Sequence, residues 1–155
     1  MLNNMVRELF AIITKWVQIQ EQRILRDGIP LTTDQMAVAR RLGVTQPEQV
    51  RILYVESLPA LPPEIMNSGI LPREQLEMLQ NAIGLTVGHG IFICQDGRQP
   101  TFILNHELVH VAQYERLGGI PGFLEQYLEE LFIHGYTKMP LEAEANRHAN
   151  ALTLN

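Results

Sequence analysis

The sequence contains a single cysteine, Cys94, in 155 residues. One cysteine excludes an internal disulfide framework and any zinc site built from several thiolates. It also favours a reducing compartment, so we expect a cytoplasmic protein. Any metal site in this chain must therefore use histidine and carboxylate side chains.

Positive charge is also scarce, because 12 Lys and Arg stand against 17 Asp and Glu and give a net charge of −5. Nucleic-acid binding and polybasic membrane contacts depend on clustered basic residues, and the chain has no long basic run, so we expect no nucleic-acid partner. The 46% hydrophobic fraction is that of an ordinary globular protein. At this length we expect one domain over residues 1–155, with a sizeable core.

Long apolar runs are missing as well. Residues 9–19 are rather apolar, but Lys15 and Gln18 interrupt them, and they lack the basic segment and cleavage site of a signal peptide. Residues 3–26 instead follow the three-and-four spacing of an amphipathic helix. We expect this helix to pack on its own domain as part of an N-terminal segment, residues 1–45. The alternative is a docking helix that contacts a partner or a membrane through Trp16 and its neighbours.

Apolar spacing and helix-end signals predict five further helices, at 35–42, 72–81, 101–117, 121–133 and 140–152. Residues 50–56 read as a strand. Residues 83–95 contain two branched, apolar runs around Gly88-His89-Gly90, which predicts a hairpin or a strand with a glycine bulge. Residues 96–100 are expected to form a turn. The predicted fold class is α+β, a mostly helical single domain with a small β-sheet or hairpin before the helix at 101–117, and residues 50–155 form the core that carries the site.

The helix at 101–117 contains the motif HELVH, from His106 to His110. Residues four apart lie on one face of a helix, so His106 and His110 can offer two ring nitrogens to one metal ion. Glu107 lies about 100° further round, where its carboxylate can act as a general base on a bound water. Two histidines with a carboxylate favour zinc. The alternative is a helix that carries these three residues by chance.

A catalytic zinc takes three protein ligands, so a third has to come from elsewhere in the fold. The alanine-rich helix at 140–152 can pack closely on the motif helix, and it offers Glu142, Glu144 and His148. The residues alone leave these three open. A rival interpretation is a non-catalytic protein whose structural metal site is closed by a fourth ligand, but such a site has no need of Glu107.

HELVH, followed by a separate helix with Glu142-Ala143-Glu144-Ala145-Asn146, resembles the gluzincin metallopeptidases, such as thermolysin-like and CAAX-prenyl-protease-like enzymes. Residues 80–150 also resemble small bacterial zinc metallopeptidases without an assigned substrate. The resemblance implies a zincin-like fold, Zn2+ as cofactor, a peptide or protein substrate, and Glu142 as the third ligand. Asn146 stands where those families have an aspartate that supports a ligand. The resemblance also implies that a strand within 83–95 pairs with an extended substrate.

Two residues before the last helix, His134 and Tyr136, are candidates for a supporting role. Either side chain could donate a hydrogen bond to the oxyanion formed during peptide hydrolysis. The alternative is that both are loop residues with solvated polar tips. The sequence thus predicts a zinc metallopeptidase with metal ligands His106, His110 and Glu142 and catalytic residues Glu107, His134 and Tyr136.

Overall fold

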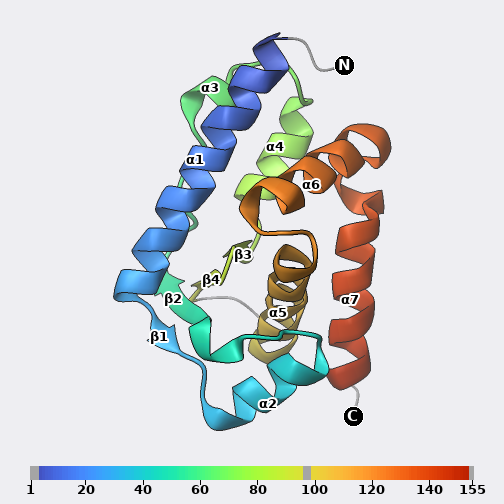
Figure 1. Ribbon diagram of the computed structural model, residues 1–155. Helices are drawn as coiled ribbons and strands as arrows, with labels where there is room; N and C mark the ends of the chain where they lie inside the picture. The colour runs from blue at the N-terminus through green and yellow to red at the C-terminus, as the bar shows by residue number, and fades with distance from the viewer. Residues whose placement is uncertain (1–3, 96–98, 154–155) are drawn as a thin grey trace.

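Four short strands form one mixed sheet in the order β1-β2-β4-β3. They are β1 (Ile29–Pro30), β2 (Arg51–Val55), β3 (Gly84–Val87) and β4 (Gly90–Cys94). The structure, a computed structural model, describes residues 4–95 and 99–153 (Figure 1). Antiparallel pairing of β3 with β4 confirms the predicted hairpin. The sequence did not predict β1, or that β2 joins β4 in parallel.

Six helices confirm those predicted, with ends that differ by at most two residues: α1 (Asn4–Asp27), α2 (Thr33–Arg41), α4 (Arg73–Gln80), α5 (Pro100–Arg116), α6 (Ile120–His134) and α7 (Pro140–Thr153). A short helix α3 (Pro63–Met66) and two 3-10 turns, η1 (Pro47–Gln49) and η2 (Tyr136–Lys138), were not predicted. Of the turn predicted at 96–100, residues 96–98 lie outside the described residues. The α+β fold class is confirmed, and the helices dominate it.

Apolar residues pack on both faces of the sheet. Alternate residues of a strand point to opposite faces, and accordingly Ile91 and Ile93 belong to one core cluster while Phe92 belongs to the other. The first cluster joins the sheet to α2, α5 and α7. The second joins it to α1 and α6. α5 therefore packs on one face of the sheet, and the N-terminal helix α1 packs on the other.

α1 packs on its own domain through the buried residues Ile13, Val17 and Ile24. Gly90 allows this approach, because a Cβ at that position would lie 2.9 Å from the Cβ of Ile24. Within the described residues, no helix combines the length and apolar character that a membrane crossing requires. Contact of α1 with a partner or a membrane stays a prediction.

The last turn of α5 is tied to two loops by Glu115. Its carboxylate accepts hydrogen bonds from the backbone N–H of Thr45 (2.8 Å) and Gln46 (3.1 Å), and it lies 3.0 Å from Nε2 of His89. Burial raises the pKa of Glu115, but these partners outweigh burial and hold the pKa below its ordinary 4.5. The lowered pKa means that the ionised carboxylate stabilises the fold above about pH 4.5, and this stability is lost as the pH falls through the folded-state pKa.

We expect Glu115→Gln to be less stable than the wild type at neutral pH. The difference in free energy of unfolding should shrink as the pH falls below 4.5, because only the wild type has a carboxylate to protonate. Urea denaturation across this range measures the effect, with Glu56→Gln as an exposed control. A difference that does not change with pH would show that the charge of Glu115 contributes nothing.

Candidate metal centre

α5 carries the HELVH motif along a buried stretch of helix. Pro100 starts the helix at its first turn, a position where the missing N–H of proline has no intrahelical partner to lose. Glu107 and His110 are each only 5% exposed. Polar side chains at this depth need partners within the protein.

For His110, α7 supplies such a partner because it packs closely along α5 (Figure 1). Ala145 and Ala149 on α7 are fully buried, and their small side chains allow the two helices to approach. Glu142 lies at the start of α7 and is 9% exposed. A carboxylate from a distant part of the chain is thereby brought to the motif helix.

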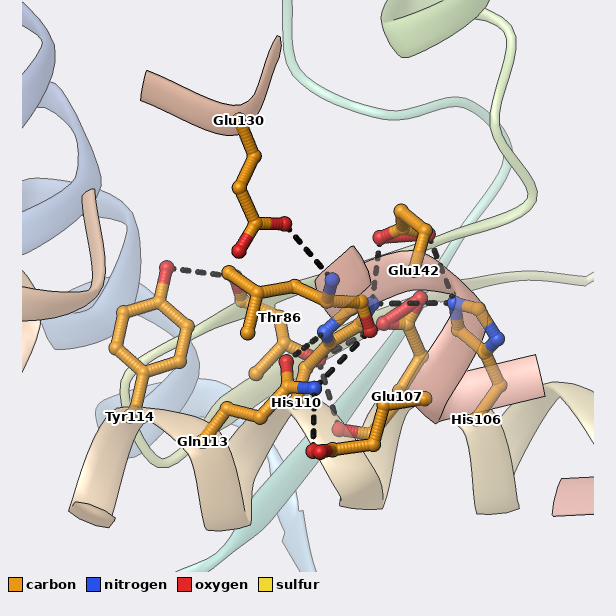
Figure 2. Close-up of polar contacts among 10 residues, drawn as sticks. Thr86, His106, Glu107, His110, Gln113, Tyr114, Glu130 and Glu142 are labelled. Atoms are coloured by element: carbon orange, nitrogen blue, oxygen red, sulfur yellow. Dashed lines mark hydrogen bonds and ion pairs between the residues drawn. The ribbon is translucent and has the colours of Figure 1, made fainter. Parts of the chain in front are cut away.

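The carboxylate of Glu142 lies against both histidines of the motif (Figure 2). Its Oε1 is 3.2 Å from Nε2 of His106, and its Oε2 is 2.8 Å from Nε2 of His110. The two Nε2 atoms are 3.1 Å apart. Glu144 instead accepts hydrogen bonds from Gln113 and Arg116, and His148 is exposed. Of the three candidates for a third ligand, only Glu142 contacts the histidines.

The two Nε2 atoms and the carboxylate of Glu142 are donors of the kind that a tetrahedral zinc ion takes. Zinc–ligand distances of about 2.0–2.2 Å place neighbouring donors about 3.4 Å apart. The observed separations are shorter and are those of hydrogen bonds: 3.2 Å from His106 to Oε1 of Glu142, 2.8 Å from His110 to Oε2, and 3.1 Å between the two nitrogens. Donor atoms of His106, Glu107 and His110 also lie within 4.8 Å of one another. Two imidazoles and a carboxylate could therefore hold a metal ion, with the carboxylate of Glu107 close by.

Gln113 determines which ring nitrogen of a neutral His110 carries the proton. Its Nε2 donates to the backbone carbonyl of Leu141 (3.0 Å) and to Glu144 (2.9 Å), which sets the orientation of the amide. Its Oε1 must then accept from Nδ1 of His110, at 2.7 Å. The lone pair of a neutral His110 is consequently on Nε2, the atom that faces Glu142. The resemblance suggested Asn146 for such a supporting role, but the structure gives that role to Gln113.

His106 is supported differently. Its Nδ1 is buried and has no hydrogen-bond partner among the described residues. The ring of Phe102 lies beside it, with the two ring centroids 6.2 Å apart. Metal-binding histidines usually donate their second N–H to an acceptor, so His106 departs from that pattern. Packing against Phe102 and the contact of Nε2 with Glu142 therefore orient this ring.

Charge couples Glu142 to the histidines. Burial would lower the pKa of His110, but the adjacent Glu142 carboxylate raises it to about 9. Burial would likewise raise the pKa of Glu142, but the charge of His110 and hydrogen bonds to both rings hold it far below its ordinary value. A cation bound at this position would therefore compete with a proton.

Glu107 is held by the sheet rather than by the histidines. Its Oε2 accepts a hydrogen bond from Oγ1 of Thr86 on β3, at 2.8 Å. The backbone carbonyl of Thr86 in turn accepts from the Tyr114 hydroxyl, at 3.1 Å. Gly84 makes room for the carboxylate, since a Cβ there would lie 2.9 Å from Oε1 of Glu107. Thr86 therefore holds Oε2 of Glu107 in place, and Oε1 accepts no hydrogen bond from Thr86.

Comparison with known proteins gives no match to any family model, curated protein or solved structure. Function therefore has to be inferred from the residues of the site itself.

The two predicted supporting residues, His134 and Tyr136, lie in different surroundings in the structure. Tyr136 lines the cavity that contains the motif, whereas His134 is exposed at the end of α6 and is not part of that lining. Burial, with the nearby carboxylates Glu142 and Glu107, raises the pKa of Tyr136, so its hydroxyl keeps its proton at neutral pH. Tyr127 lines the same cavity, and burial raises its pKa also. Tyr127 was not among the candidate residues that the sequence indicated.

Glu130 is a further buried carboxylate that the sequence did not single out. Its Oε1 accepts a hydrogen bond from the backbone N–H of Leu141, at 2.8 Å, and its Oε2 accepts from Gln126, at 3.0 Å. A carboxylate at this place satisfies an unpaired N–H in the first turn of α7 and suits the positive end of the helix dipole. Glu130 thereby fixes the start of the helix that carries Glu142 (Figure 2).

Proposed function

We propose that this protein is a zinc-dependent metallopeptidase. His106, His110 and Glu142 would bind the metal, and Glu107 would act as general base. The observation that carries the proposal is the contact of Glu142, from a separate helix, with both Nε2 atoms of the motif. That contact supports a site of three ligands, with the buried carboxylate of Glu107 nearby, over a motif that stands alone.

A bound zinc ion would lower the pKa of a water molecule and polarise the substrate carbonyl. The residues around it supply the proton transfers. Glu107 would take a proton from the attacking water at Oε1, the oxygen that does not accept from Thr86, while the water oxygen bonds to the substrate carbonyl carbon. It would then pass that proton to the amide nitrogen as the carbon–nitrogen bond breaks and the amine leaves. Thr86 keeps the carboxylate oriented during both transfers. Tyr136 and Tyr127 remain protonated and can donate hydrogen bonds to the developing oxyanion.

Two features support a catalytic site over a structural one. Neither Glu144 nor His148, which could have closed the site as a fourth ligand, contacts the histidines. The motif also opens on a cavity of about 990 Å³, where a structural site would need no access. We assign the oxyanion role to Tyr136 rather than to His134 because only Tyr136 lines that cavity. The single cysteine supports a cytoplasmic location.

Hydrolysis of a mixed library of quenched fluorescent peptides tests the proposal. We expect cleavage by the zinc-loaded protein, loss of cleavage on removal of the metal by a chelator, and recovery on addition of zinc. Cleavage that survives complete chelation would contradict the proposal. So would the absence of cleavage in a protein that holds one zinc ion per chain.

Gln113 gives a second prediction, since it orients His110. We expect Gln113→Leu to weaken zinc binding by about 10- to 100-fold, the usual effect of removing the hydrogen-bond partner of a ligand. Chelator competition on the folded protein measures this. The control is Glu144→Gln, which removes the charge of another partner of Gln113 and keeps the bond to His110. Equal affinities in Gln113→Leu and the wild type would show that this hydrogen bond does not support the metal.

A further inference from the structure

The cavity beside the candidate metal centre is much larger than the metal and one water require. Its volume of about 990 Å³ lies at the upper end of the range of about 300–1,000 Å³ that is usual for ligand pockets. It is bounded by α1, by the segment 58–71, by α4 and α6, and by β3. The N-terminal helix, for which docking to a partner was only the alternative, is thus one wall of this space.

The walls away from the motif are apolar. α1 contributes Leu9, Phe10 and Trp16, and α4 contributes Leu79, all of them only partly buried. Side chains of this kind that remain unpacked inside a domain gain free energy when an apolar ligand covers them. An apolar ligand is therefore the one that these walls favour.

The charged side chains of the cavity lining further limit the kinds of ligand that can bind. Within the described part of the chain, no Lys or Arg lines it. Its carboxylates include Glu107 and Glu142 at the site and Glu125 and Glu129, both exposed, on α6. Away from the histidines of the motif, an anionic group such as a fatty-acid carboxylate or a phosphate would meet the carboxylates of Glu125 and Glu129 and no Lys or Arg. A neutral ligand, or one with a positive end, avoids this repulsion.

Two features of the cavity favour a polypeptide. β3 is an edge strand in the described sheet, and all four of its residues line the cavity beside Glu107. Extended chains commonly add to sheet edges through backbone hydrogen bonds. In addition, three exposed apolar residues, Ile83 (40% exposed), Phe132 (51%) and Ile133 (66%), belong to the same lining. They extend the apolar surface from the interior to the outside of the molecule.

We propose that the substrate of this site is an uncharged, apolar segment of polypeptide, several large hydrophobic residues long. The segment lies between α1, residues 58–71 and β3, with its scissile bond at the metal centre. The inference rests on the proposed peptidase function and adds the class of sequence that the enzyme accepts. It also gives α1 a role in substrate binding.

Trp16 provides a direct binding signal, because it is the one tryptophan of the chain and it lines the cavity. The full-length protein is titrated, with chelator present to prevent turnover, against two peptides of equal length that share a lysine tail for solubility. One peptide contains large apolar residues and the other contains serine, glutamine and glycine. We expect the apolar peptide to change the tryptophan fluorescence with saturation and the polar peptide to leave it unchanged.

Two matched variants on α1 locate the binding. Leu9→Gln puts a polar side chain into the cavity wall and should weaken binding of the apolar peptide by about tenfold. Ile19→Gln makes a similar change at a residue that is 50% exposed and is not part of the cavity lining, and it should bind as the wild type does. Equal weakening by both variants would overturn the assignment of the cavity.

The remaining outcomes separate this inference from the proposed function. Zinc-dependent cleavage of both peptides at similar rates would overturn the apolar preference and leave the peptidase proposal standing. Saturable binding of the apolar peptide without cleavage by the zinc-loaded protein would support the cavity assignment and contradict the peptidase proposal. Saturable binding of a neutral fatty amide, with no response to the apolar peptide, would overturn a polypeptide substrate.

Discussion

Glu107→Gln is expected to reduce peptide hydrolysis by about 10²- to 10⁴-fold, the usual contribution of general acid–base catalysis. Glutamine has nearly the shape of glutamate and can still accept the hydrogen bond from Thr86. It cannot take up a proton from water at neutral pH. Glu107 is not one of the three proposed ligands, so the variant should bind zinc as the wild type does.

The measurement combines initial rates of peptide cleavage with zinc content on the same preparation. Glu56→Gln, an exposed substitution of the same kind, serves as control and should leave both quantities unchanged. Unchanged hydrolysis in Glu107→Gln would remove the general base from the mechanism. Loss of zinc together with activity would instead make Glu107 a ligand.

Glu142→Gln is expected to weaken zinc binding by more than the about 10- to 100-fold that loss of a supporting hydrogen bond costs. The substitution removes the negative charge that faces both histidines. Without that charge, the pKa of His110 should fall from its raised value of about 9, because Glu142 is the partner that raises it. The variant would lose Glu142 as the third ligand, and His110 would lose the negative charge beside it.

Chelator competition measures the affinity, and Glu144→Gln is the matched control on the same helix. Glu144 bonds to Gln113 and Arg116 and should affect zinc binding far less. An affinity that falls in Glu144→Gln and not in Glu142→Gln would move the third ligand two residues along α7. Circular dichroism of each variant shows whether the helices remain folded.

Much of the fold could be predicted because its signals are local. The capping box at Thr32 and Gln35 marks the start of α2, and the hairpin of β3 and β4 turns at Gly88, which adopts a positive φ of 67°. The facing positions of His106 and His110 follow from the geometry of a helix. The parallel pairing of β2 with β4 has no such signal, because 34 residues separate Val55 from Gly90 in sequence and only tertiary packing brings them together.

The site was predicted less completely than the fold. Glu142 came from a resemblance, since spacing alone did not separate it from Glu144. Gln113 and Thr86 were not predicted because their roles depend on which elements pack against α5. Gln113 left one weak signal, a position three residues after His110 on the same helix. The cavity was not predicted either, because α1, α4 and α6 form it together.

Metal content tests the central claim most directly. The purified protein is loaded with zinc, dialysed extensively, and analysed for zinc and for protein concentration by elemental and amino-acid analysis. The account predicts about one zinc ion per chain, since three ligands and one open position define a single site. A folded protein that retains no zinc after loading would contradict it, and HELVH would then be only part of a buried helix.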